Sequence, residues 1–150
     1  MSLWPADINQ PLDLKSPYLL IKKQASELGI QTNNIVEAIV SEVSTKTKAQ
    51  FAYAFYLHSS ITNYSYRLFS FYFDIDFYPV TLRVDEEISQ EVDLNPGDFI
   101  TNEVKVNNEE ELNDYLKLIF SSQKTKRVVS ALYKMADPDD KPTKQKKVPF

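Results

Sequence analysis

The chain has 150 residues, a formal net charge of −4 and no cysteine. Its length suits one domain with a core of its own, and the absence of thiols excludes disulfides, thiolate metal sites and cysteine nucleophiles. Only two glycines are present, which argues against the glycine-rich phosphate loops of nucleotide-binding folds, and no cofactor is expected.

The chain begins without a basic leader followed by an apolar run. No stretch approaches the roughly 20 apolar residues that span a bilayer. We therefore expect a soluble, cytoplasmic protein without a membrane segment. Residues 1–15 follow neither the helical nor the strand period, which predicts an arm that lies on the domain or frays from it.

The first helix is expected over residues 17–29. Ser16 is a typical N-cap, and Pro17 suits the first helical position because its missing amide donor has no partner there. An apolar stripe at helical spacing runs from Tyr18 onward. Gly29 is expected to end the helix in a left-handed conformation.

The next fifty residues alternate apolar and polar side chains and are rich in aromatic and β-branched types, as in strands. The polar breaks between these runs are short. Neighbouring strands are therefore expected to be antiparallel, because a parallel crossover needs a dozen residues or more. The predicted strands lie at about 35–44, 49–58, 64–77 and 79–85, with a short fifth strand at 99–106.

The segment between the fourth and fifth strands, residues 86–98, is acidic and is expected to be a loop. Asn108 and the three glutamates that follow it are typical of a helix N-terminus, because they cap amides and suit the positive end of the helix dipole. An apolar stripe from Leu112 to Phe120 predicts this helix. A last helix is expected over 124–136.

Together these elements predict an α+β fold. An antiparallel meander of four to five strands covers about 35–106, and one N-terminal and two C-terminal helices pack on one of its faces. The domain is expected to cover 1–136. Residues 137–150 are charged and contain proline, which predicts a flexible tail.

The third strand suggests a recognition surface. If its alternation is unbroken, phenylalanines face the core, and tyrosines face a partner or are covered by the arm or by each other. Tyrosine is enriched at the energetic centres of protein interfaces. The residues predicted to bind a partner are Tyr64, Tyr66, Tyr72 and Tyr78, together with Asp74 and Asp76 on the same face.

From these features we expect a small non-enzymatic module that binds or regulates a protein. Examples of such modules are an inhibitor, an immunity-type protein and an accessory subunit. The contact is expected to use the tyrosine face or the acidic segment at 85–98. No catalytic set of side chains is recognisable, and the identity of the protein partner does not follow from the residues.

A first alternative is binding of single-stranded nucleic acid. Tyrosines on a sheet stack unpaired bases, and the lysines and arginines of the C-terminal end supply positive charge. Against this, the whole chain is acidic, and Asp74 and Asp76 repel a phosphate backbone.

A second alternative is a divalent-metal enzyme that uses Asp74, Asp76 and Glu86. Two carboxylates two residues apart on a strand share a face and suit a hard cation. They are equally typical of charges that keep an aromatic strand soluble. No recognised calcium-loop pattern is present, and no metal site is predicted. His58, the single histidine, is interpreted as solvated or simply hydrogen-bonded.

Overall fold

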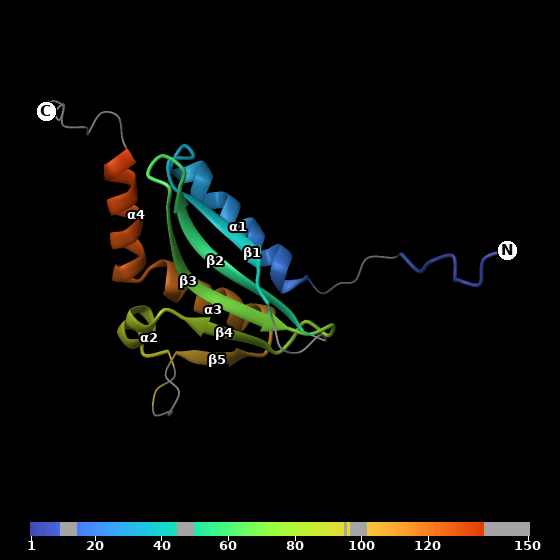
Figure 1. Cartoon of the computed structure of the whole chain (residues 1–150). Coiled ribbons are helices and arrows are strands. Elements are labelled where there is room, and N and C mark those ends of the chain that lie inside the picture. Colours follow the sequence, from blue (N-terminus) through green and yellow to red (C-terminus); the bar gives the residue numbers. More distant parts are fainter. Residues whose placement is uncertain (10–14, 45–49, 95, 97–101, 137–150) are drawn as a thin grey trace, which may run out of the picture.

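The computed structural model describes residues 1–9, 15–44, 50–94, 96 and 102–136. Within them the chain forms an α+β fold in which five strands build one antiparallel meander, ordered β1-β2-β3-β4-β5 (Figure 1). The predicted fold class is confirmed. The elements are α1 (Pro17–Gln31), β1 (Glu37–Glu42), β2 (Phe51–Ser59), β3 (Tyr64–Phe73), β4 (Val80–Val84), α2 (Glu86–Val92), β5 (Glu103–Val106), α3 (Glu109–Phe120) and α4 (Gln123–Ala136).

The helices pack on one face of the sheet, as the sequence predicted. On α1, Tyr18 lies 4.6 Å from Tyr53 of β2, measured between ring centres. Phe120, at the end of α3, lies 5.4 Å from Phe55 of the same strand. The last helix, α4, also contacts β2, and α2 packs against α3 and α4 beyond the ends of β4 and β5 (Figure 1). We call this side of the sheet the covered face and the other side the open face.

The core of the covered face is largely aromatic. Phe55 and Phe69 stack across β2 and β3 with ring centres 4.9 Å apart, and Phe71 is fully buried beside them. Burying one such side chain stabilises a fold by about 1.5–3 kcal/mol relative to leaving it exposed. The predicted alternation, with the phenylalanines facing the core, therefore holds along the second half of β3, where Phe69, Phe71 and Phe73 are buried.

The first half of β3 does not follow that alternation, because the strand contains a bulge. Phe55 pairs with Phe69, whereas the next residue of β2, Tyr56, pairs with Arg67. Leu68 is therefore left without a partner in β2. Beyond an extra residue in one strand, each side chain points to the face opposite to the one that simple alternation predicts.

The bulge corrects the prediction that all the tyrosines of β3 share one face. Tyr66 pairs with Leu57, and Tyr64 with Ser59, so both point to the covered face with the core residues. Tyr72 pairs with Ala52 and points to the open face.

The third strand is also shorter than predicted, because it ends at Phe73 and not at residue 77. The amide of Asp76 donates to Oδ1 of Asp74 (3.3 Å), and the amide of Phe77 donates to the Asp74 carbonyl (2.9 Å). These bonds form a turn, and Phe77 has a φ of 75°. An aspartate that bonds the backbone two residues ahead favours turns over strands.

Helix α1 continues past Gly29 to Gln31, so Gly29 is not the predicted left-handed end. Two asparagines take the positive φ values instead, 53° at Asn33 and 63° at Asn34. Asparagine tolerates this region better than most residues. Gly29 allows the Asn34 side chain to lie close to the helix backbone, because a Cβ at Gly29 would lie 3.0 Å from the Asn34 side-chain oxygen.

The acidic segment predicted to be a loop forms the short helix α2. The Asp85 side chain accepts from the amide of Ile88 and caps the helix, and Ile88 is fully buried. Glu86 and Glu87 occupy the first turn, where negative charge suits the helix dipole. The predicted turn at 95–98 and the predicted tail at 137–150 lie mainly or wholly outside the described residues.

Candidate functional site

The six predicted site residues do not form one surface. Tyr66 lies on the covered face, where its hydroxyl donates to Oδ1 of Asp85 (2.6 Å). The ammonium of Lys124 lies 5.1 Å from the centre of the Tyr66 ring. Burial raises the pKa of Tyr66, and the hydrogen bond to Asp85 raises it further. Tyr66 therefore joins β3, α2 and α4 and is a structural residue.

The other tyrosines are placed differently from one another. Tyr78 packs against the core; burial raises its pKa, and its buried hydroxyl has no hydrogen-bond partner among the described residues. Tyr64 is exposed at the start of β3, on the side of the covered face. Tyr72 alone of the four lies on the open face.

Asp74 and Asp76 are exposed in the turn before β4, so they do not project together from a strand. Glu86 follows β4, at the opposite end of that strand. The predicted carboxylate cluster is therefore not assembled. Across the described ranges, no group of three or more histidines and carboxylates is arranged to hold a metal ion.

The acidic segment uses its carboxylates to attach α2 to α4. Glu87 bonds Lys124 and also bonds Arg127 at 3.4 Å. The hydrogen bond from Lys124 lowers the pKa of Glu87. Glu91 accepts from the amide of Gln123, at the start of α4, at 2.8 and 3.0 Å. These three contacts occupy two of the charges on which recognition by this segment would depend.

The open face carries no helix in the described part of the chain (Figure 1). Its centre consists of small side chains, Ala52, Ala54 and Ser70, with exposed fractions of 3, 0 and 4%. Tyr56 and Tyr72 are half-buried beside them, and the Ser70 hydroxyl donates to the Tyr72 hydroxyl (3.4 Å). The result is a floor of small residues bordered by aromatic rings.

Charged and apolar side chains surround this floor. Arg67 and Arg83 are exposed, and Arg83 forms an ion pair with Glu103 (3.2 Å). By strand pairing, the open face comprises Glu37, Ile39 and Ser41 of β1, Ala52, Ala54, Tyr56 and His58 of β2, Ser65, Arg67, Ser70 and Tyr72 of β3, Thr81 and Arg83 of β4, and Glu103 and Lys105 of β5.

One row on the open face has the residue types of a catalytic triad. His58 Nδ1 and Ser65 Oγ share a hydrogen bond (2.7 Å), and Glu37 lies opposite His58 on β1. Within the described part of the chain, His58 and Glu37 form no hydrogen bond. The row supports the interpretation of His58 as a hydrogen-bonded surface residue.

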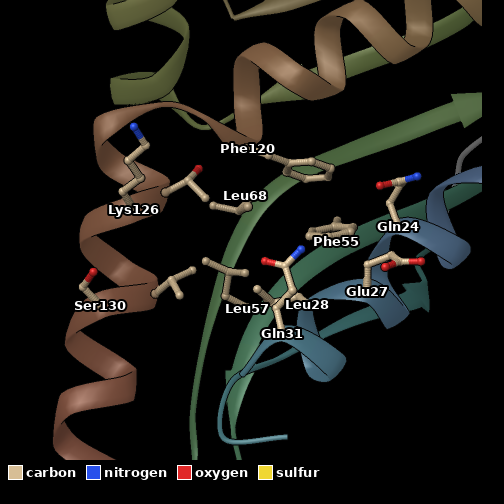
Figure 2. Close-up of a pocket in the computed structure, with 12 residues that line it drawn as sticks. Gln24, Glu27, Leu28, Gln31, Phe55, Leu57, Leu68, Phe120, Lys126 and Ser130 are labelled. Carbon is tan, nitrogen blue, oxygen red and sulfur yellow. The ribbon is translucent and has the colours of Figure 1, made fainter. Parts of the chain in front are cut away.

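The covered side contains a groove between α1 and α4, of about 340 Å³ (Figure 2). Phe55, Leu57 and Leu68 rise from the sheet between the two helices, and Phe120 closes one end. Sequence analysis missed this groove, because it depends on the spacing of helices about one hundred residues apart and on the bulge at Leu68. Its polar rim consists of Gln24, Glu27, Gln31, Thr125, Lys126 and Ser130.

Comparison with protein-family models, with curated proteins and with solved structures gives no match to this chain. None of the helices in the described part combines the length and apolar character needed to cross a bilayer.

Proposed function

We propose that this chain is a small non-enzymatic module that binds or regulates a protein, such as an inhibitor or an accessory subunit. It makes contact through the open face of its sheet. The observation that carries the proposal is a five-stranded sheet with all described helices on one side and Tyr56 and Tyr72 on the other.

The composition of the open face supports protein contact. Tyrosine and arginine are enriched in protein interfaces and at their energetic centres. Here Tyr56, Tyr72, Arg67 and Arg83 surround a floor of small side chains. A partner would meet the rings and the guanidinium groups, because the small side chains beneath them are almost fully buried.

The proposal replaces most of the predicted contact residues. Tyr72 is retained, and Tyr56 and the two arginines take the place of Tyr66 and Tyr78, whose rings pack toward the core. The acidic segment contributes less, because Glu87 and Glu91 already bond α4.

The test compares binding by three versions of the chain. A protein retained from native lysate by the wild type should be lost when Tyr56 and Tyr72 are both replaced by alanine. The control is Leu118→Ala, at an exposed position on α3. Equal retention by the double variant and the control rejects the open face as the contact surface.

Binding of single-stranded nucleic acid is a second candidate, favoured by one observation. Arg67, Arg83 and Lys105 lie on the open face with the tyrosines, and Asp74 and Asp76 do not. Among the described residues of that face, the carboxylates that oppose these cations are Glu37 and Glu103.

Fluorescence anisotropy with a labelled oligothymidylate tests this second candidate. Binding should weaken as salt rises, because phosphate contacts release counterions. The variant Arg67→Gln should reduce the salt dependence, whereas Lys134→Gln on α4 should leave it unchanged. No anisotropy change at low salt excludes this candidate.

A further inference from the structure

The outer edge of β1 presents backbone groups that bond nothing in the described part of the chain. The amide of Val43 donates to the carbonyl of Ala52 (3.0 Å), and Glu42 pairs with Tyr53. Because bonding alternates along an antiparallel pair, the odd-numbered residues of β1 bond β2. The N–H and C=O groups of Ala38, Val40 and Glu42 therefore point outward.

This edge has few of the features with which sheets usually prevent pairing. Strand β1 contains no proline and no lysine, its two glutamates stand at its ends, and its ladder with β2 is unbroken. Ile39, at its centre, is 40% exposed. The other edge, β5, is four residues long, carries Lys105 and leads directly into α3. Short strands and edge lysines discourage association, whereas a regular apolar edge is a template for another strand.

We propose that β1 pairs antiparallel with β1 of a second copy of this chain, with Ile39 on the two-fold axis. Ala38 then exchanges both backbone hydrogen bonds with Val40 of the second copy, and Val40 with its Ala38. The two Ile39 side chains face each other on the open face. Glu37 lies opposite Ser41 of the second copy, so no glutamate faces another.

Other registers fit less well. A shift by one residue places open-face side chains against covered-face side chains, which the pleat does not allow. A shift by two residues places Val40 on the axis and sets Ile39 opposite Ser41. The register centred on Ile39 instead sets the most exposed apolar side chain of the strand against its own copy, and Glu42 lies opposite Val36, just outside the strand.

The pairing joins two five-stranded sheets into one continuous sheet. Its two-fold axis is perpendicular to the sheet, so both open faces lie on the same side. The proposal does not depend on the proposed function, because it concerns the backbone edge and not the tyrosine face.

Because the chain has no cysteine, one substitution gives a clean crosslinking test. Ile39→Cys places two thiols in a non-hydrogen-bonded pair with Cα atoms about 4.5 Å apart, which a disulfide can bridge. The matched control is Ser41→Cys, on the same face, whose two copies would lie about 13 Å apart in this register. Mild oxidation at micromolar concentration should convert most of Ile39→Cys to covalent dimer and little of Ser41→Cys.

Equal crosslinking of the two variants indicates random collision and overturns the proposal, as does the absence of crosslinking in both.

Sedimentation equilibrium gives an independent measurement. The wild type should have twice the 17.3 kDa chain mass, and Ile39→Lys should return it to one chain that keeps the circular dichroism spectrum of the wild type. The control Thr81→Lys, on the inner strand β4, should remain dimeric. A wild type that sediments as a single chain at about 100 μM contradicts the proposal.

Discussion

The two faces of the sheet contain similarly inaccessible residues but differ in what those residues contribute. On the covered face Phe69 and Phe71 have exposed fractions of 1 and 0%, and on the open face Ala54 also has 0%. A phenylalanine buries about 150–250 Å², whereas an alanine has little side chain to bury. Fractional exposure alone therefore does not locate the stabilising surface, and the open face can change with little effect on folding.

The largest expected effect on stability follows from removing a core side chain of the covered face. Phe69→Ala should lower the free energy of unfolding by about 3–5 kcal/mol, because it removes a stacked ring and leaves a cavity. Urea denaturation followed by circular dichroism measures this change. On the open face, Tyr72→Ala should cost markedly less. Similar losses for the two variants would contradict the division between a stabilising face and the proposed recognition face.

A smaller effect is expected at the link between the sheet and α2. Asp85→Ala removes the cap of α2 and the acceptor of the Tyr66 hydroxyl, and should lower stability by about 1–3 kcal/mol. The comparison is Tyr66→Phe, which keeps the cap and should cost about 1 kcal/mol. If the two variants lose the same stability, the cap contributes nothing.

The charged border of the open face should contribute less again. Arg83→Ala removes an exposed ion pair with Glu103 and should change the free energy of unfolding by less than about 1 kcal/mol. A larger loss, measured by the same urea titration, would mean that the arginine is part of the structure and not of a binding surface.

The smallest expected effect depends on pH. The folded state lowers the pKa of Glu87 from its ordinary value of 4.5. Its contribution is therefore complete above that value and is lost as the pH falls through the lowered pKa. In Glu87→Gln the melting temperature should fall less steeply between pH 5 and about pH 2. Glu86→Gln, in the same turn, is the control and should follow the wild type.

Much of the fold follows from local sequence signals that tertiary contacts reinforce. Ser16 and Asn108 cap α1 and α3 as predicted, and the short connections produce the predicted meander. The acidic segment was predicted to be a loop because its charges are dense. The signal of a helix was present in Asp85, followed by two glutamates and the buried Ile88.

The candidate site was harder to predict, because a bulge is defined by the neighbouring strand. Two residues nevertheless disagreed with the predicted alternation of β3. Arg67 would have faced the core with the phenylalanines, and Leu68 would have been an apolar residue among the tyrosines. The bulge places Arg67 on the open face and buries Leu68. When a charged residue is predicted to face the core and the apolar residue next to it is predicted to face outward, an inserted residue lies at that position.

Leu68 also determines how β3 tolerates a change of length. Loss of this one codon would join Arg67 directly to Phe69, and these two residues already face opposite sides of the sheet. Arg67 and Tyr66 would therefore keep their present faces, and the loss would be that of the buried Leu68 side chain. At this position a deletion of three nucleotides changes packing and not register.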